Sequence, residues 1–409
     1  MNTSKPVRIL QLVPESLPTF RADVAVLFGK YLPRLGIRCN LVGKAGSGDL
    51  SDPGFLSMTR PVAGGRRWLR EFRFFRLCLG QLMKANRDNC DVIQVRDMVS
   101  IGLAGWLIAR MKGLPYAYWV SYLMSEGRIL RAREELAVRP RLHYYLVLLK
   151  GLVEKKLLYG VVLRNANHVF VQSEEMKRLM MEQGIPADKL TPVPMGVDTE
   201  TMKAEAIVPR RLPGWENVPL IAYLGTLDAT RRHDKVLDAL LLLRATHPDA
   251  RLLLIGDSPT PSDLDKLRRH AADIGLPPEA LAITGWLPRD EALPLLVAAD
   301  AAISHFPRGD LLDSASPTKL LEYMALGIPA IGNDNPDQVV LLSASGAGWL
   351  TGSNAPAFAQ AMVAILADRE GARHRAAAGP SFIEQHRSYR VLAEEVARSY
   401  RRMVSHPTV

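Results

Sequence analysis

Cysteine is scarce in this sequence, and its scarcity excludes two classes of protein. The 409 residues contain three cysteines, Cys39, Cys78 and Cys90, without the CxxC or Cys/His spacing of a metal site. An odd and sparse set of this kind does not make the disulfide framework of a small secreted domain. It predicts reduced, buried thiols in a cytosolic protein.

Long apolar runs are also missing. The two most apolar stretches, residues 100–124 and 144–163, are interrupted by charged residues, so neither offers the roughly 18 apolar residues of a membrane-spanning helix. The first residues, MNTSKPVRILQLVP, lack the apolar core of a signal peptide. We therefore expect a cytoplasmic protein, with the inner face of the cytoplasmic membrane as the place where it would meet lipid.

Positive charge is in excess. Lysine and arginine total 52 against 42 aspartates and glutamates, a formal net charge of +10, which suits a nucleotide, a phospholipid surface or nucleic acid. Nucleic acid is the least favoured of the three, because the aromatic residues are not interleaved with basic ones in a recognisable recognition module.

Short apolar runs alternate with helical stretches along the whole chain. This alternation predicts an α/β protein with parallel sheets that are covered by helices on both faces. The strands that we expect are residues 8–13, 39–42, 91–95, 116–120, 168–172, 220–224, 250–255, 281–284, 301–304 and 328–332.

The chain is too long for one comfortable core, and the segment 197–219, rich in proline, arginine and polar residues, divides it. We predict two Rossmann-like domains, residues 1–200 and 201–384, which face each other across a cleft. The last segment, 385–409, carries apolar residues at helical spacing and is expected to pack back on the first domain. In such sheets ligands bind beyond the carboxyl ends of the strands.

Dinucleotide-dependent dehydrogenases share this fold class, but the turn after the first strand excludes them. There the chain reads PESLPTFR, without Gly-x-Gly-x-x-Gly, and no Gly-x4-Gly-Lys-Ser/Thr phosphate loop occurs in the sequence.

The stretch SASPTKLLEYMALGIPAI has the residues of an anion site. Ser316 as N-cap and Pro317 as first helical residue predict a helix start, and the free N–H groups of Ser316 to Thr318 attract an anion. Lys319 adds a cation on the same turn, and Glu322 can accept hydrogen bonds from the vicinal diol of a ribose. The alternative is an ordinary capped amphipathic helix with one surface glutamate.

Three predicted strands of the second half end in glycine turns, at Gly225, Gly256 and Gly285. Because the carboxyl ends of parallel strands meet at one edge of a sheet, these turns, the helix start and the cations Arg231 and Lys319 are expected to converge there. Such an arrangement suits a nucleoside diphosphate.

The chain resembles the retaining GT-B glycosyltransferases of glycosyltransferase family 4. The resemblance covers nearly the whole chain and is strongest over residues 223–332, with further matches in VFVQSE (169–174) and PVPMGVD (192–198). It implies a GT-B fold and a hexosyltransferase that moves a sugar from a nucleoside-diphosphate sugar to a glycan or lipid-linked acceptor. Bacterial surface polysaccharide synthesis is the setting that it suggests.

By this resemblance the donor site lies in the second domain. The family's Gly-Arg pair and later lysine fall on Gly225, Thr226 and Arg231, so Arg231 would bind the diphosphate. The family's Glu-x7-Glu motif falls on Ser314 and Glu322; Glu322 matches the ribose-binding glutamate, and Ser314 replaces the residue that usually holds the donor sugar. The turn Trp286-Leu287, directly after Gly285, resembles the family segment whose backbone contacts the nucleobase. The catalytic residues would thus be Arg231, Lys319 and Glu322, and the donor-binding residues Gly225, Thr226, Trp286, Leu287, Ser314, Ser316, Pro317 and Thr318.

The first domain departs further from the family. Thr19 and Arg21 stand where the family has a Gly-Gly turn near the diphosphate, and Ser121 stands where it often has a histidine near the reacting carbon. A serine can hydrogen-bond a sugar hydroxyl but is no proton acceptor near neutral pH. Arg96 and Glu126 are the other polar residues that could lie on the acceptor side, although a structural ion pair with Asp97 is the favoured role for Arg96.

Departure of a nucleoside diphosphate calls for fixed positive potential at the leaving phosphate. Arg231, Lys319 and the helix start would supply it, so we expect no metal and no cofactor, the nucleotide sugar being a substrate. The resemblance implies that the leaving phosphate itself can take the acceptor's proton. Two alternatives stay open, a non-catalytic nucleotide-sugar-binding protein, because Ser314 and Ser121 replace functional groups, and a GT-B sugar-nucleotide epimerase.

Two basic segments each allow two interpretations. In Arg66–Leu79 (RRWLREFRFFRLCL) a helical stripe that includes Trp68, Phe72 and Phe75 lies opposite arginines. Such a helix either makes a peripheral contact with anionic lipid or packs its apolar stripe into the core. The arginine-rich segment Arg128–Arg141 is open to the same two interpretations.

Overall fold

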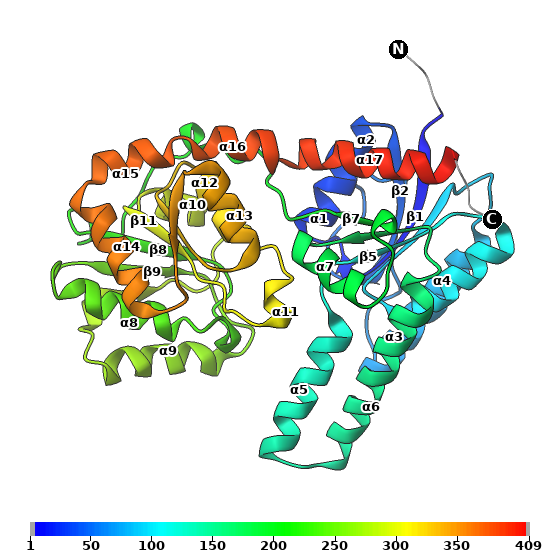
Figure 1. The fold of residues 1–409 in the computed structure, drawn as a ribbon, viewed down its shortest axis with the longest axis horizontal. Coiled ribbons are helices and arrows are strands. Elements are labelled where there is room, and N and C mark those ends of the chain that lie inside the picture. The colour runs from blue at the N-terminus through cyan, green and yellow to red at the C-terminus, as the bar shows by residue number, and fades with distance from the viewer. Residues whose placement is uncertain (1–4, 406–409) are drawn as a thin grey trace. The chain divides into compact units, whose positions relative to one another are not determined.

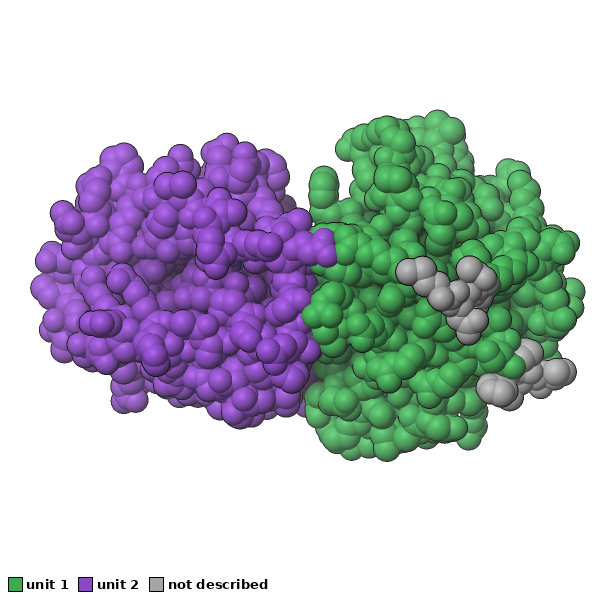
Figure 2. Space-filling view, turned by 90° about the horizontal axis from the view of Figure 1, so that it is seen from above, with its two compact units in different colours: residues 1–195, 389–409 green, residues 196–388 purple. Residues whose placement is uncertain are grey.

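The computed structural model describes residues 5–405 and divides into two compact units. Unit 1 is Met1–Met195 with Tyr389–Val409, and unit 2 is Gly196–Ser388 (Figure 2). The ends of the predicted domains, 1–4 and 406–409, lie outside the described residues. Each unit is a parallel sheet covered by helices (Figure 1), so the prediction of two Rossmann-like α/β domains is confirmed.

The sheet of unit 1 has seven parallel strands in the order β3-β2-β1-β4-β5-β6-β7. The strands are β1 (Val7–Leu17), β2 (Ile37–Ala45), β3 (Ser57–Thr59), β4 (Val92–Arg96), β5 (Tyr116–Val120), β6 (His168–Val171) and β7 (Leu190–Pro192). The helices are α1 (Ala22–Ala25), η1 (Leu27–Tyr31), α2 (Leu32–Arg34), α3 (Arg67–Lys84), α4 (Val99–Lys112), α5 (Met124–Val138), α6 (Leu142–Leu157), η2 (Leu158–Leu163), α7 (Glu174–Glu182), η3 (Ala187–Lys189) and α17 (Tyr389–Ser405). Strand β5 is buried along its whole length, and its sequence is a continuous run of apolar and aromatic residues. Strand β4 is equally buried but carries the polar Gln94 and Arg96.

The C-terminal helix α17 packs on this sheet. Its side chains at helical spacing, Leu392, Val396 and Tyr400, are buried in the unit 1 core. The Tyr400 ring lies 5.2 Å from the Phe170 ring, centroid to centroid, and its hydroxyl donates a hydrogen bond to Gln94. The last helix therefore completes the core of the first unit, although the whole of unit 2 separates the two in sequence.

Unit 2 has six parallel strands in the order β10-β9-β8-β11-β12-β13. The strands are β8 (Leu220–Leu224), β9 (Arg251–Ile255), β10 (Leu281–Ile283), β11 (Ala301–Ser304), β12 (Ala330–Asn333) and β13 (Gly348–Thr351). The helices are η4 (Ala204–Ala206), η5 (Ala229–Arg231), α8 (Asp234–Arg244), α9 (Pro261–Asp273), η6 (Pro278–Ala280), α10 (Arg289–Val297), α11 (Asp310–Asp313), α12 (Thr318–Ala325), α13 (Pro336–Ser345), α14 (Ala355–Ala367), α15 (Arg369–Ala376) and α16 (Gly379–His386). The central strand β8 pairs with β9 on one side and β11 on the other, so the loops after these strands lie together at one edge.

The structure shows which side of Arg66–Leu79 packs into the core. Helix α3 buries Phe74, Cys78 and Leu82 rather than the predicted stripe. Trp68 is 65% exposed and Phe72 is 52% exposed. Helix α3 therefore packs an apolar face into the core, as one interpretation expected, but that face is not the predicted stripe. Contact of the exposed aromatic rings with lipid stays a prediction.

Two other expectations can be compared with the structure. All three cysteines are free and buried, as predicted. Within residues 5–405, no helix combines the length and the hydropathy that crossing a bilayer requires.

Candidate active site

A pocket of about 260 Å³ opens at the carboxyl edge of the unit 2 sheet. Four of the predicted donor-binding residues, Gly225, Thr226, Trp286 and Leu287, line it. Trp286 is 75% exposed, so its indole is available to a ligand at the rim. The complete lining is Leu224, Gly225, Thr226, Ile255, Gly256, Asp257, Trp286 and Leu287.

Glycine is required where the turns after β8 and β9 meet. Gly225 has φ 153° and Gly256 has φ 150°, both outside the range that other residues adopt readily. A Cβ on Gly256 would lie 1.9 Å from the carbonyl oxygen of Gly225. Gly256 also forms an isolated antiparallel bridge with Gly285. The three strand-end glycines thus converge as predicted, and two of them, Gly225 and Gly256, line the pocket.

We expect Gly256→Ala to destabilise unit 2 by about 1–3 kcal/mol, because the new methyl group collides with backbone that has no room to move. Gly285→Ala is the matched control: its φ is also positive, at 73°, but nothing lies within 4 Å of the added Cβ. Scanning calorimetry of the full-length protein should give the lower melting temperature for Gly256→Ala. Equal melting temperatures for the two variants would contradict this account of the pocket wall.

Lys319 and Glu322 lie beside the same turn. The Nζ of Lys319 is 2.9 Å from Oε2 of Glu322, and both side chains are partly exposed. A Cβ on Gly225 would be 3.0 Å from Cε of Lys319. The buried Tyr323 fixes this helix, because its hydroxyl accepts a hydrogen bond from the Leu224 N–H at 2.9 Å. Helix α12 is therefore held against the end of β8, with its lysine and glutamate at the pocket.

Arg231 is the last residue of η5, a few residues after Gly225. Its guanidinium carbon lies 4.8 Å from the centroid of the Phe306 ring, a cation–π contact that limits where the side chain can point. Burial raises the pKa of Tyr223 to about 12, while nearby Arg231 lowers it and Asp228 and Glu322 raise it. Tyr223, whose hydroxyl would lie 2.9 Å from a Cβ on Gly225, is thus within the electrostatic influence of both Arg231 and Glu322.

The predicted helix start is wrong by one residue. Helix α12 begins at Thr318 with Pro317 as N-cap, and this N-cap makes no side-chain hydrogen bond. Ser316 instead donates its hydroxyl to Asp337 at 2.6 Å, and Arg387 pairs with the same carboxylate. The serine anchors the loop to α13, and the N-cap residue Pro317 offers no side-chain acceptor to the first-turn N–H groups of α12.

Ser314, which stands at the first position of the Glu-x7-Glu motif, is buried. Its hydroxyl donates to the carbonyl of Leu311 at 2.8 Å, within the turn that ends α11. The side chain is thus directed into its own turn.

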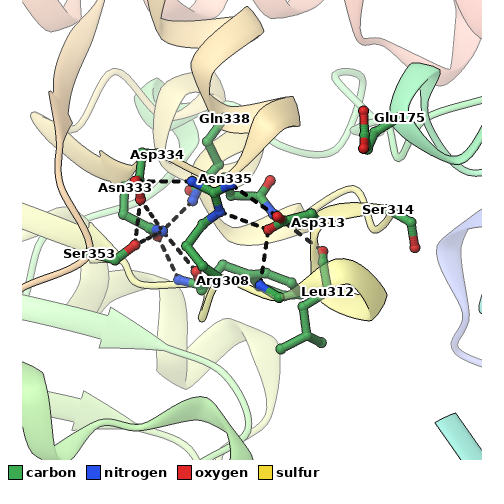
Figure 3. Close-up of polar contacts among 12 residues, drawn as sticks. Glu175, Arg308, Leu312, Asp313, Ser314, Asn333, Asp334, Asn335, Gln338 and Ser353 are labelled. Carbon is green, nitrogen blue, oxygen red and sulfur yellow. Dashed lines mark hydrogen bonds and ion pairs between the residues drawn. The ribbon is translucent and has the colours of Figure 1, made fainter. Parts of the chain in front are cut away.

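A charged group braces the loop between β11 and α12 (Figure 3). Arg308 bridges two carboxylates, with its Nε 2.8 Å from Oδ1 of Asp313 and its Nη1 3.0 Å from Oδ2 of Asp334. The side-chain amide of Asn333 accepts a hydrogen bond from the N–H of Phe306 and donates one to its carbonyl oxygen, both at 2.8 Å. These contacts position Phe306, and through it Arg231. They join segments distant in the sequence, so no local pattern could have predicted them.

In unit 1, Arg96 lies at the centre of a buried ion network. The residue is fully buried, with its Nη2 2.6 Å from Oδ2 of Asp23 and its Nε 3.3 Å from Oε1 of Glu15. Arg21 reaches the same aspartate, Nε to Oδ1, at 3.1 Å. The geometry of Arg96 is that of a structural ion pair, the role favoured for it with Asp97, whose Oδ2 lies 3.5 Å from its Nε. Arg21 remains partly exposed at the sheet edge.

Ser121 joins this network through Asp97. Asp97 has φ 51° and accepts hydrogen bonds from the N–H of Ser121, at 2.8 Å, and from its hydroxyl. Burial raises the pKa of Asp97, although Arg96 opposes the shift. Thr19 accepts a hydrogen bond from the N–H of Arg21 at 3.1 Å. Four predicted acceptor-side residues therefore follow the ends of β1, β4 and β5.

Glu126 lies apart from this group. Its carboxylate is 3.6 Å from Nζ of Lys155, so it braces α5 against α6. Over the described range 5–405, no three His, Cys, Asp or Glu side chains gather closely enough to hold a metal ion.

Solved structures and family models match the chain over most of its length. Anabaena HepE in complex with UDP covers 97% of this chain and 100% of its own, with a TM-score of 0.66 and 14% sequence identity. Sucrose-phosphate synthase from Thermosynechococcus elongatus covers 98% and 99%, with a TM-score of 0.70 and 17% identity. Residues 23–201 match Glycosyltransferase Family 4, and residues 218–368 match Glycosyl transferases group 1. The chain belongs to the GT-B glycosyltransferases.

Curated relatives of this GT-B glycosyltransferase are mannosyltransferases. It is 29% identical to the GDP-mannose-dependent alpha-(1-6)-phosphatidylinositol dimannoside mannosyltransferase of Mycobacterium tuberculosis over 196 residues. The matched region is 47% of this chain and 48% of the relative. It is 25% identical over 211 residues to the GDP-mannose-dependent monoacylated alpha-(1-6)-phosphatidylinositol monomannoside mannosyltransferase of Corynebacterium glutamicum, 50% of this chain and 54% of the relative. The chain thus spans about half the length of the curated relatives it matches.

Proposed function

We propose that this protein is a retaining, metal-independent glycosyltransferase that moves a sugar from a nucleoside-diphosphate sugar to a glycan or lipid-linked acceptor. The observation that carries the proposal is the meeting of a glycine-walled pocket with Arg231, Lys319 and Glu322 at one edge of the unit 2 sheet. A pocket of that lining suits a flat base, and the groups beside it suit a diol and a diphosphate.

Each part of the donor then has a partner. The base enters the pocket beside Trp286 and Leu287, and the ribose hydroxyls donate to Glu322. The diphosphate lies between Lys319, Arg231 and the first-turn N–H groups of α12. As the bond from the anomeric carbon to the phosphate oxygen breaks, its electron pair passes to the phosphate, and the acceptor's hydroxyl oxygen forms the new bond to the anomeric carbon on the same face. The fixed cations stabilise that growing charge, and the phosphate accepts the acceptor's proton.

The relatives suggest the first donor and acceptor to test. Those in M. tuberculosis and C. glutamicum are named as GDP-mannose-dependent enzymes that act on phosphatidylinositol mannosides. We therefore place GDP-mannose first among donors and a lipid-linked glycan first among acceptors, in surface glycan or glycolipid synthesis at the cytoplasmic face of the membrane.

A second candidate function is binding without transfer. Ser314 and Ser121 replace groups that the family uses, and both hydroxyls are engaged within the protein, with Leu311 and Asp97. A non-catalytic sensor would bind the donor without consuming it. An epimerase would convert the donor with no acceptor present, so donor consumption with and without acceptor separates the three.

Thermal stabilisation tests the donor site directly. We expect one sugar nucleotide in a panel of UDP-, GDP-, ADP- and dTDP-sugars to raise the melting temperature by about 5–10 °C at about 100 times its dissociation constant. The rise should persist in EDTA, because the cations are arginine and lysine side chains. If no sugar nucleotide in the panel raised the melting temperature of the folded protein, the proposed donor site would be wrong. Loss of the rise in EDTA would overturn metal independence.

A further inference from the structure

Helices α5 and α6 form an antiparallel hairpin that projects from unit 1 (Figure 1). The inner face of α6 is defined by its contacts with α5. A Cβ on Gly151 would lie 2.8 Å from the Ile129 side chain, and Glu154 pairs with Arg128 across the two helices. The side chains on the opposite side of α6 therefore point away from the hairpin.

That outward face is apolar. Its six large side chains are between 45% and 76% exposed, which is unusual for a helix surface that faces water. At 100° per residue they form a single stripe along the whole helix, so they make one continuous surface and are not scattered exposures. The stripe consists of Leu142, Tyr145, Leu146, Leu149, Leu152 and Val153.

The exposed charged residues that flank the stripe are basic. Arg139 and Arg141 occupy the exposed turn before α6, and Lys150 and Lys156 are exposed beside the apolar residues. The one carboxylate of α6, Glu154, pairs with Arg128 of α5, and its Oε1 also lies 3.8 Å from Nζ of Lys150. A second copy docked face to face would bring like charges together, whereas a surface of lipid phosphates meets both the apolar stripe and the cations.

We propose that the outward face of α6 docks on an anionic phospholipid bilayer. The helix lies in the plane of the interface, with its leucines at the boundary between headgroups and acyl chains and its lysines and arginines among the phosphates. The surface differs from the aromatic face of α3. It also requires neither donor nor acceptor, so it extends beyond the proposed transfer reaction.

Flotation of the full-length protein with lipid vesicles tests the proposal. The protein should bind vesicles of phosphatidylglycerol and phosphatidylcholine in equal parts, and bind phosphatidylcholine alone much more weakly. Leu146→Glu with Leu149→Glu should lower the partition coefficient on the anionic vesicles by about tenfold or more, since two apolar anchors become anions. Leu241→Glu with Leu242→Glu is the matched control, with two exposed leucines of α8 and the same change in charge.

Each outcome has a fixed meaning. Equal binding by the two double variants, or no binding by the unaltered protein, would overturn the proposal. Normal binding by the α6 double variant, together with lost binding by a Trp68→Glu, Phe72→Glu double variant, would assign the lipid contact to α3 instead. A dimer in light scattering that only the α6 change dissociates, without vesicle binding, would identify a second copy as the occupant. None of these results depends on the sugar-nucleotide panel, so the two proposals fail separately.

Discussion

Lys319→Ala should reduce sugar transfer by about 10²- to 10³-fold, the loss typical of removing one fixed group that stabilises charge in a transition state. The reason is the position of the side chain, against Gly225 and beside the pocket, where the leaving diphosphate is proposed to sit. Binding of the free nucleoside diphosphate, measured by calorimetric titration, should weaken as well, because the cation acts on the same phosphates in both states.

The ion pair between Lys319 and Glu322 offers a competing explanation. Were the lysine only a partner for Glu322, its removal would cost little, since partly exposed pairs three residues apart on a helix contribute a few tenths of a kcal/mol. Lys266→Ala is the matched control: Nζ of Lys266 is 2.9 Å from Oδ1 of Asp263, again three residues away, on α9. We expect nearly unchanged melting temperatures for both variants and lost transfer for Lys319→Ala alone.

Glu322→Gln separates the two members of the pair. The amide keeps one hydrogen-bond acceptor for the ribose but loses the charge, so nucleotide binding should weaken by about tenfold, the effect of one charge-assisted hydrogen bond. Lys319→Ala should instead affect the diphosphate, and its effect should vanish when the nucleoside without phosphates is titrated. Identical effects of both variants on the nucleoside would contradict the assignment of separate roles.

The sequence predicted the fold well because its signals are local. The apolar runs that became β8, β11 and β5 are short, continuous and bounded by turns, as buried parallel strands require. The donor-site glycines were predictable for the same reason: each ends a strand, and strand ends converge at one edge.

Other features depend on partners that are distant in the chain. Ser316 has the sequence of an N-cap, but the carboxylate of Asp337 on α13 competes for its hydroxyl. Phe306 limits the position of Arg231 through a cation–π contact between residues that are far apart in the sequence, so no sequence pattern indicates it. The outward face of α6 contains ordinary apolar residues, and only the packing of α5 decides which of them are left exposed. These features follow from tertiary contacts, which local propensity and periodicity do not encode.

Arg96→Met should destabilise unit 1 by about 3–5 kcal/mol at neutral pH, the cost of leaving buried carboxylates without their cation. Glu15, Asp23 and Asp97 all surround the guanidinium, and methionine fills similar space without charge. Urea denaturation of the full-length protein measures the loss. Arg96→Lys should recover only part of the lost stability, because a compact ammonium group cannot donate to several carboxylates at once in the way that the planar guanidinium does.

The pH dependence of this loss follows from the directions of the pKa shifts. Burial raises the pKa of Asp23, but Arg96 and then Arg21 outweigh it, so the folded pKa is below the unfolded one. Its contribution is present above the unfolded pKa of about 4 and is lost as the pH falls. Glu15 and Asp97, with pKa values raised by burial, contribute in the opposite sense and lose stability as the pH rises through their folded pKa.

Removing Arg96 should raise the pKa of all three carboxyl groups, because the guanidinium lowers each of them in the native protein. The folded variant then takes up protons more readily than the native protein, so its stability deficit should shrink as the pH falls from about 7 towards about 4. Arg178→Met is the control, since Arg178 also pairs with two carboxylates, Glu175 and Glu182, but on the exposed face of α7. Solvent screens that network, so its loss should leave the unfolding midpoint almost unchanged at every pH. A deficit for Arg96→Met that is constant with pH would mean that lost packing, rather than uncompensated charge, destabilises the variant.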